Sequence, residues 1–369
     1  MRAFDRNDGA ATVKTIGRYI GREVLGSTGL VLLGLVVLFT FFDLIRELGD
    51  MSVQAPFRRA LFYVMLGLPT HLYEMFPIAA LIGTLFALST LVANSEYTVM
   101  RTSGASLPQV GWALTRVGLV LVAITFMLGE FVVPHSEKIA QQFKLQARNQ
   151  VVAQEFRSGV WLRQDRNFIN IRQVELPETI LLGVRIYEFD AEHKLSSVSQ
   201  ADRGQYIGAN QWRLTGITQT TLTPQAARVT HLPEMTWRSV LDPSFLSVLL
   251  VQPERMSAAN LYQYIGYLAE NKQKTSRYEI AFWKKVAYPV AVLVMMFLAL
   301  PFAQFQRRSG SIGTRIFSGI MLGLLFYTFN MFFTYLGVLY DWPPLPSAMF
   351  PTLMFFVMAA GMLWWLERR

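Results

Sequence analysis

Few side chains in this sequence occur in a pattern that could catalyse a reaction. There is no GxxxxGK[ST] stretch to hold nucleotide phosphates and no HExxH pair to hold zinc. The four histidines, at positions 71, 135, 193 and 231, lie in different segments, and without cysteine a zinc site would need distant carboxylates. No serine sits in a GxSxG elbow. These observations argue against an enzyme.

The most informative short stretch is ANSEYTVMRTSGAS, residues 93–106, which joins two apolar segments. Asn94 or Ser95 can cap a short helix there, and Glu96 in its first turn suits the helix dipole. One interpretation is a capped turn at the membrane interface. The other is a coupling helix, a short element across the membrane plane that fits a groove in an ATPase and transmits its movement. Glu96 and Arg101 would then make the charged contacts.

Six apolar segments must position these residues. Of the 369 residues, 52% are hydrophobic and only 16% are charged, a balance typical of membrane proteins. Five segments are uncharged over a length that spans hydrocarbon, and the third contains Arg116 and ends near Glu130. The six segments are 24–42, 75–95, 107–133, 286–306, 316–340 and 342–366. We therefore predict a membrane α-helical protein with six transmembrane helices.

Two of these helices are expected to extend beyond the hydrocarbon. The second, 60–93, would measure about 51 Å at 1.5 Å per residue, and Pro69 and Pro77 predict that it is kinked. The third continues through polar residues to about Gln150. Protruding helices suit an extended connection to a domain outside the membrane.

Lys and Arg on the short loops predict the orientation. With the N-terminus in the cytoplasm, most of these residues fall on cytoplasmic segments and few on the opposite loops. The cytoplasmic ones are Arg2, Arg6, Lys14, Arg18, Arg22, Arg101, Arg116, Arg307, Arg308, Arg315, Arg368 and Arg369, and the opposite loops hold Arg46, Arg58 and Arg59. Both termini are then cytoplasmic, and the long polar region lies outside, in the periplasm of a Gram-negative cell.

The polar region between the third and fourth helices predicts a β domain. Between 135 and 270 it holds 14 Lys and Arg against 13 Asp and Glu, so nucleic-acid binding is not expected. Alternation begins near Gly159 and predicts hairpins that turn at 165–167 and at 191–193. Two more strands follow, separated by prolines at 224 and 233. We predict an antiparallel sandwich or jelly roll, followed by a helix that Ser257 or Asn260 caps.

Several stretches, in order, resemble the LptF/LptG (YjgP/YjgQ) permease family, the membrane subunits of the lipopolysaccharide exporter, and are most similar to its LptG branch. They are TIGRYIGREVL, FPIAALIGTLFALSTLVANSE, SEYTVMRTSGAS, GEFVVPHSEKIA, GVWLR, FINI and SIGTRIFSGIMLGLLFYTFN. The resemblance implies six transmembrane helices with a periplasmic β-jelly roll inserted between helices 3 and 4. The expected division is 1–150 for helices 1–3, with the coupling helix at about 94–104, 151–245 for the jelly roll, and 246–369 for a connector helix and helices 4–6.

The resemblance also implies partners. They are an LptF-like permease, an LptB-like ATPase dimer, an LptC-like protein with one helix and a jelly roll, and a periplasmic LptA-like bridge. ATP and Mg are used by the ATPase, and no cofactor is expected on this chain. Hydrolysis would collapse a cavity between the two permeases and push lipopolysaccharide from the outer leaflet of the inner membrane toward the outer membrane. Ser95, Glu96 and Arg101 would couple to the ATPase.

Lipid A requires cations at the outer interface and apolar side chains below them. By resemblance, Arg46 and Lys144 are the expected cations, and Asp43 is expected to pair with Arg46 when no lipid is bound. The expected acyl-chain contacts are Phe39, Phe41, Phe42, Phe326, Tyr327 and Phe333. Thr40, Glu47 and Gln141 occupy positions where relatives can carry basic residues, so the head-group site differs from the family pattern there.

Two alternatives remain at this level. An ABC-associated mechanotransmission protein would also carry a large outer domain, but would bind no lipid. A secondary transporter would need acidic or histidine relays at mid-membrane depth and an internal repeat, neither of which is evident.

Overall fold

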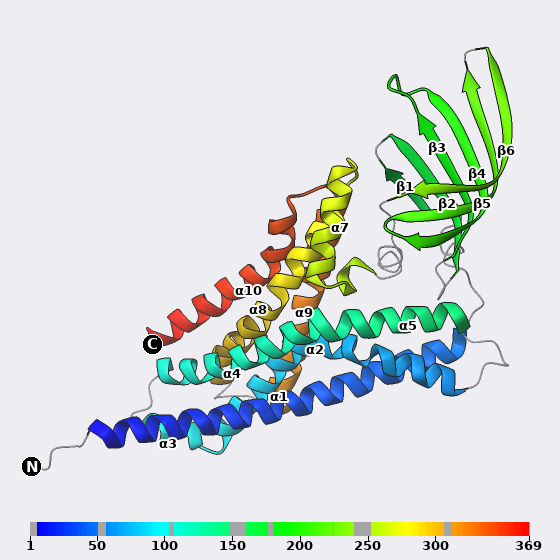
Figure 1. Ribbon diagram of the computed structural model, residues 1–369. Helices are drawn as coiled ribbons and strands as arrows, with labels where there is room; N and C mark the ends of the chain where they lie inside the picture. Colours follow the sequence, from blue (N-terminus) through cyan, green and yellow to red (C-terminus); the bar gives the residue numbers. More distant parts are fainter. Residues whose placement is uncertain are drawn as a thin grey trace, which may run out of the picture. The chain divides into compact units, whose positions relative to one another are not determined.

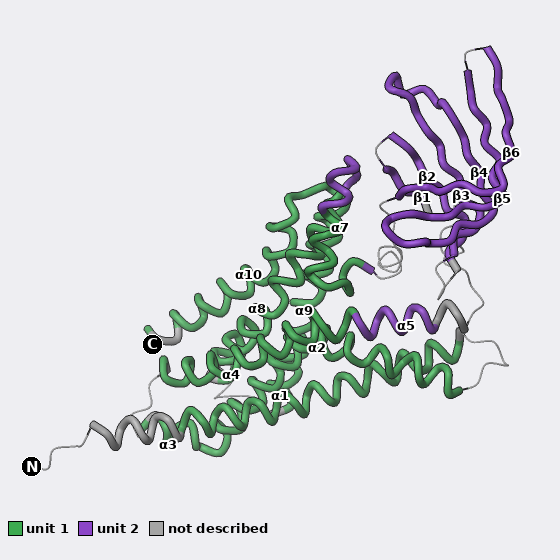
Figure 2. Tube along the Cα trace, in the orientation of Figure 1, with its two compact units in different colours: residues 1–134, 253–265, 275–369 green, residues 135–252, 266–274 purple. Residues whose placement is uncertain are grey.

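The computed structural model describes residues 6–50, 57–102, 107–147, 160–164, 166–175, 180–223, 225–239, 252–305 and 312–368. The chain forms two compact units (Figure 2). The helical unit comprises Met1–Pro134, Pro253–Ile265 and Thr275–Arg369, and the β unit comprises His135–Gln252 and Gly266–Lys274.

Most of the chain is helical (Figure 1). The helices before the strands are α1 (Arg6–Asp50), α2 (Phe57–Ala93), α3 (Glu96–Thr102), α4 (Leu107–Met127), the π-helical turn η1 (Leu128–Val132) and α5 (Val133–Ala147). Those after the strands are the 3₁₀ turn η3 (Pro253–Arg255), α7 (Ala258–Glu270), α8 (Ser276–Phe305), α9 (Ile312–Leu339) and α10 (Pro344–Glu367).

The prediction of six membrane-spanning helices is confirmed. Within the described residues, six helical stretches are long and apolar enough to cross a bilayer. They are Ile16–Gly49, Phe57–Ala93, Pro108–Phe143, Ser276–Ala303, Gly313–Leu339 and Pro344–Trp365. The third predicted segment, which contains Arg116, lies in the continuous run of α4, η1 and α5.

Prolines explain the local geometry of two spans. Pro69 and Pro77 lie inside α2 as expected, and each lacks the N–H that would bond the preceding turn. In the third span, Pro134 is the second residue of α5, two positions after Val132 at the end of the π-helical turn η1. Because a proline ring clashes with the carbonyl four residues earlier, widening of the helix at 128–132 is a physical way to accommodate it.

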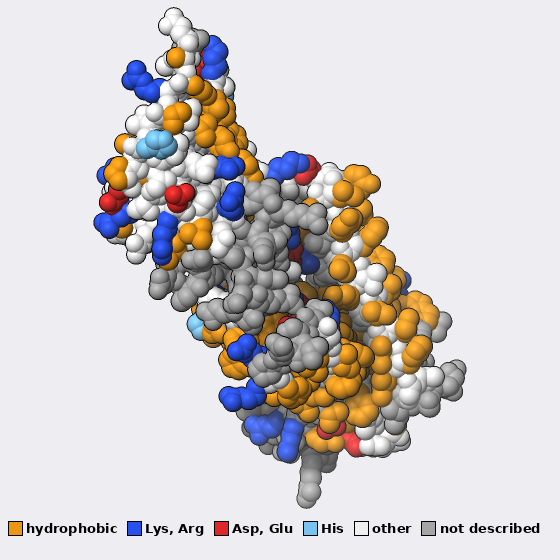
Figure 3. Space-filling view, turned by 90° about the vertical axis from the view of Figure 1, so that its right-hand side faces the viewer, with side chains coloured by type: hydrophobic (Ala, Val, Ile, Leu, Met, Phe, Trp, Pro, Cys, Tyr) orange, Lys and Arg blue, Asp and Glu red, His pale blue; other side chains and the backbone are white. Residues whose placement is uncertain are grey.

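The core of the helical unit is built around α2 and α8. Buried side chains of α1, α2, α3, α4, α8, α9 and α10 form one cluster, with Leu85, Leu114, Met295 and Phe355 at most 1% exposed. In contrast, α1 carries many exposed apolar side chains, among them Leu30, Leu33 and Val37. Hydrophobic side chains also cover much of the face of this unit that Figure 3 shows. Such a surface suits hydrocarbon or a partner helix rather than water.

The β unit contains one antiparallel sheet of six strands in the order β1-β2-β3-β4-β5-β6. The strands are β1 (Val160–Gln164), β2 (Asn167–Glu175), β3 (Ile180–Phe189), β4 (Leu195–Gly208), β5 (Gln211–Thr223) and β6 (Ala226–Arg238). The predicted antiparallel β domain is therefore present. Jelly-roll connectivity stays a prediction, because each described strand pairs with its neighbour in sequence.

The prediction that Pro233 separates two strands is wrong. Pro233 does not separate two strands but lies inside β6, between Leu232, which pairs with Ile217, and Glu234, which pairs with Thr215. A proline cannot donate a ladder hydrogen bond, and β6 is an edge strand in the described sheet, where this loss is tolerated.

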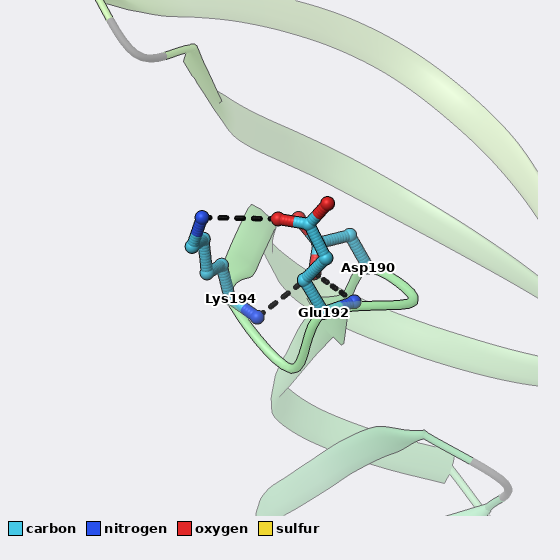
Figure 4. A network of polar contacts seen from close by, with 3 residues as sticks. All are labelled: Asp190, Glu192 and Lys194. Carbon is cyan, nitrogen blue, oxygen red and sulfur yellow. Dashed lines mark hydrogen bonds and ion pairs between the residues drawn. The ribbon is translucent and has the colours of Figure 1, made fainter.

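The predicted hairpin turn at 191–193 is confirmed, and Asp190 stabilises it (Figure 4). Its Oδ1 accepts hydrogen bonds from the backbone N–H of Glu192 and Lys194, both at 2.9 Å, and Lys194 also pairs with Glu192. His193 takes the left-handed conformation with φ of +62°. The core of the sheet is apolar, with Trp212 and Leu214 fully buried.

Ser257 caps α7, as predicted. Its Oγ accepts the backbone N–H of Asn260 at 3.1 Å, and its carbonyl accepts that of Leu261 at 3.0 Å. At the other end of α7, the Tyr267 hydroxyl donates to the carbonyl of Arg163 in β1, and burial raises the pKa of this phenol.

Candidate functional site

Three polar side chains meet where the end of α1 packs on α2. Asp43 Oδ1 lies 3.5 Å from the Arg46 guanidinium, and Asp43 Oδ2 lies 2.6 Å from His71 Nε2. The expected contact between Asp43 and Arg46 is therefore present. We call Asp43, Arg46 and His71 the α1–α2 polar cluster.

The three members of this cluster differ in exposure. The Arg46 side chain is 78% exposed, Asp43 33% and His71 only 14%. His71 also stacks against Phe39, with ring centroids 6.2 Å apart. The partly buried imidazole contacts one oxygen of the carboxylate, and the guanidinium is exposed. The cluster thus presents a cation that one carboxylate partly neutralises.

His71 was not among the predicted site residues. It lies between Pro69 and Pro77 of α2, and nothing in one sequence pairs it with Asp43 on another helix. The sequence signals that could have drawn attention to this pair are a histidine and an aspartate within long, mostly apolar helices.

The predicted aromatic residues form two groups on different helices. Phe39, Phe41 and Phe42 of α1 are 39%, 56% and 56% exposed, and Phe41 and Phe42 contact each other. On α9, Tyr327 is exposed and Phe333 packs on Phe350 of α10 at 4.6 Å between centroids. Both α1 and α9 pack against α2.

Phe326 is more deeply buried than these residues. It is only 2% exposed and meets Phe355 of α10 edge to face at 5.2 Å. In this structure its ring belongs to the core of the helical unit, so an apolar ligand could contact it only after this packing opens.

The second predicted cation and the three departures from the family pattern lie on α1 and α5. Lys144 lies in α5, in the β unit, and its side chain is outside the described set, so its role as a second head-group cation stays a prediction. Glu47 is 7% exposed and Thr40 is half-buried. Gln141 donates to Glu137 Oε1 at 3.0 Å. None of these three supplies a cation beside Arg46.

The short helix predicted between the second and third spans is α3, which has Glu96 in its first turn. Ser95 precedes it with φ of +63°, and its carbonyl accepts the N–H of Val99. Asn94 Nδ2 reaches Glu96 Oε1 at 3.4 Å. Arg101 lies in the last turn of α3, and its side chain is outside the described set.

Glu96 has a partner that the sequence did not indicate. The Tyr19 hydroxyl of α1 donates to Glu96 Oε2 at 2.8 Å. Next to Glu96, Tyr97 is 4% exposed and belongs to the same buried cluster as Ile20 and Val24 of α1. The short helix is thus attached to α1 as well as to α2.

The carboxylate of Glu130 binds the first turn of α7. Glu130, in the π-helical turn η1, accepts the backbone N–H of Ala258 at 2.8 Å and that of Ala259 at 3.2 Å. These are donors that the first turn of α7 cannot satisfy internally. Among the described residues, no group of three His, Asp or Glu side chains is placed to hold a metal ion.

Comparison with known proteins assigns the chain to a family. The family model described as lipopolysaccharide export system permease LptF/LptG matches residues 18–368, nearly the whole chain. The chain belongs to the LptF/LptG family. Two individual relatives support this assignment along their full lengths.

Both relatives carry the name lipopolysaccharide export system permease protein LptG. The protein of Haemophilus influenzae is 33% identical over 361 residues, which cover 97% of this chain and 99% of that protein. The protein of Escherichia coli strain K12 is 32% identical over 359 residues, 96% of this chain and 98% of that protein. This LptF/LptG family member is therefore a transmembrane permease of lipopolysaccharide export, and a permease subunit fits a chain without enzymatic motifs.

Proposed function

We propose that this chain is the LptG-like subunit of an ABC exporter. It takes lipopolysaccharide from the outer leaflet of the inner membrane and passes it to a periplasmic jelly-roll bridge, powered by a separate ATPase. Both termini are cytoplasmic and the β unit is periplasmic in this proposal. The observation that carries it is a LptF/LptG match over residues 18–368, combined with an exposed arginine above aromatic side chains on α1.

The α1–α2 polar cluster is proposed to receive a lipid A phosphate. The contact between Asp43 and Arg46 is long and mostly exposed, a type of ion pair that contributes little to stability. A phosphate can therefore replace the carboxylate on the guanidinium, with stronger and bidentate hydrogen bonds. His71 keeps its contact with Asp43, so the displaced carboxylate does not lose both partners. Lys144 is proposed as a second phosphate cation.

The acyl chains are proposed to lie along exposed and partly exposed aromatic residues of α1 and α9. Phe39, Phe41 and Phe42 lie within about one helical turn of Asp43, which places apolar contacts beside the head-group cation. Tyr327 and Phe333 supply the corresponding surface on α9. Phe326 is proposed to join them when α9 and α10 separate during transport.

The ATPase is proposed to dock on α3 through Ser95, Glu96 and Arg101. In this arrangement an LptB-like dimer binds ATP and Mg, an LptF-like permease completes the lipid cavity, and LptC-like and LptA-like jelly rolls continue the path. The Lpt name of the relatives supports such a system, and the individual contacts are part of the proposal.

A photocrosslinking amino acid at Phe41 tests lipid binding. In the assembled exporter in lipopolysaccharide-containing membranes, position 41 should form lipopolysaccharide adducts. The same probe at Leu30, an exposed apolar residue elsewhere on α1, should react mainly with phospholipid. No lipopolysaccharide adduct at position 41, or equal adducts at both positions, would support a mechanotransmission protein instead.

A further inference from the structure

Two consecutive residues of α3, Glu96 and Tyr97, attach this helix to α1. Glu96 accepts the hydroxyl proton of Tyr19, and Tyr97 is buried with Ile20 and Val24 in one cluster. The hydrogen bond to a carboxylate is of the stronger, charge-assisted kind, although both partners are partly exposed. A displacement of α3 therefore acts on this segment of α1 as well as on α2.

Helix α1 can carry such a displacement across the membrane. It runs without a proline from Arg6 to Asp50, whereas α2 contains two. Tyr19 and Arg46 are about 40 Å apart along its axis at 1.5 Å per residue. Between them, α2 approaches the backbone of Thr28 so closely at Gly83 that a methyl group there would clash. One end of this helix contacts α3, and the other carries the α1–α2 polar cluster.

We propose that Tyr19 is a positioning residue that ties α3 to α1, so that a displacement of α3 moves α1 and shifts Asp43 and Arg46 relative to His71 of α2. The release of lipid would then be driven through α1 from its opposite end. This inference rests on the proposed function, because it takes α3 as the ATPase contact and Arg46 as the head-group cation.

The test uses the assembled exporter in proteoliposomes, with two quantities measured together: ATP hydrolysed and lipopolysaccharide released. Tyr19→Phe removes the hydroxyl and keeps the ring. Lipopolysaccharide released per ATP should fall about five-fold, the scale of one partly exposed hydrogen bond to a charged group. Complex assembly and ATP hydrolysis should stay close to those of the unmodified protein. Tyr262→Phe, at a tyrosine of α7 that is 71% exposed, is the matched control and should leave the ratio unchanged.

The outcomes separate this inference from the proposed function. A normal ratio in Tyr19→Phe with a lowered ratio in Glu96→Ala overturns the role of Tyr19 and leaves the ATPase contact standing. Normal ratios in both variants remove Glu96 from ATPase coupling and overturn both. An equal fall in hydrolysis and release in Tyr19→Phe assigns Tyr19 to ATPase docking and overturns its positioning role.

A second measurement follows α1 directly. The chain contains no cysteine, so Leu48→Cys introduces a single thiol for a spin label near Arg46, and Leu339→Cys places a control label at the end of α9. When ATP is added, the spectrum of the spin label at position 48 should change less in Tyr19→Phe than in the chain with Tyr19. The change in the spectrum of the label at position 339 should be the same in both. An undiminished change at position 48 overturns the inference.

Discussion

At the scale of single residues, Asp43 is shared between two partners of different exposure. One of its oxygens faces exposed Arg46 and the other faces partly buried His71. In the proposed head-group site, the balance between these contacts would decide how readily Arg46 binds a phosphate. His71 would then influence phosphate binding without contacting the phosphate.

His71→Ala should weaken lipopolysaccharide binding. Without the imidazole, Asp43 pairs more strongly with Arg46, and a phosphate must compete with that pair. The expected loss is about 0.5–1 kcal/mol, a few-fold in affinity. A lipopolysaccharide titration of the purified complex, read by the adduct yield at position 41, measures it. Asp43→Asn should strengthen lipopolysaccharide binding. Equal affinities of the unmodified protein and the two variants would contradict this account of the cluster.

At the scale of elements, close contacts between helices determine which motions are possible. Gly83 allows α2 to touch the backbone of Thr28, and Glu130 holds the first turn of α7. The first contact packs α1 closely on α2 between the two ends of α1, and the second joins the third span to the helix that precedes α8.

Gly83→Ala should destabilise the packing of α1 on α2. The added methyl group would clash with backbone atoms, which cannot move as a side chain can, and overpacking of this kind costs about 1–3 kcal/mol. The thermal unfolding midpoint of the purified complex in detergent should fall. Gly67→Ala is the control in the same helix, because a methyl group there meets open space. Similar midpoints for the two variants would be inconsistent with a tight contact at Gly83.

Glu130→Ala should loosen the start of α7. Two backbone donors lose their acceptor, a change comparable to the loss of an N-cap, at about 1 kcal/mol. Hydrogen exchange at Ala258 and Ala259 should become several-fold faster, while Leu268 near the other end of α7 serves as the internal control. Unchanged exchange at both alanines would show that the contacts with Glu130 do not protect these two donors.

At the scale of the whole molecule, the two units have separate hydrophobic cores. The helical core is built around α2 and α8, and the β core contains Trp212. Two separate cores predict that damage to one unit leaves the other folded.

Trp212→Ala tests this independence. Trp212 is completely buried, and its removal should cost the β unit about 3–5 kcal/mol. Limited proteolysis should then cleave within the strands and leave the spanning helices intact. Trp161→Ala, at a residue that is 52% exposed, is the matched control. Simultaneous loss of both units would contradict the separation of the cores.

The sequence predicted what depends on local pattern. Hydropathy located the six spans, and period-two alternation located the hairpin at 191–193. Pro233 was misjudged because its effect depends on whether its strand lies at an edge, a non-local property. The contacts of His71 with Asp43, Tyr19 with Glu96 and Glu130 with Ala258 join residues far apart in the chain. No spacing rule in a single sequence pairs them. Phe326 was expected to contact acyl chains because its burial against Phe355, on another helix, cannot be read from the sequence.

The most direct test of the central claim follows the lipid at position 41 while the ATPase works. In the assembled exporter, the lipopolysaccharide adduct of a photocrosslinker at Phe41 should form before ATP is added and decline after ATP is added. With Glu96→Ala, the adduct should persist in the presence of ATP. The account would be contradicted if ATP left the adduct unchanged in the unmodified chain, or if the Glu96→Ala exporter lost it equally fast.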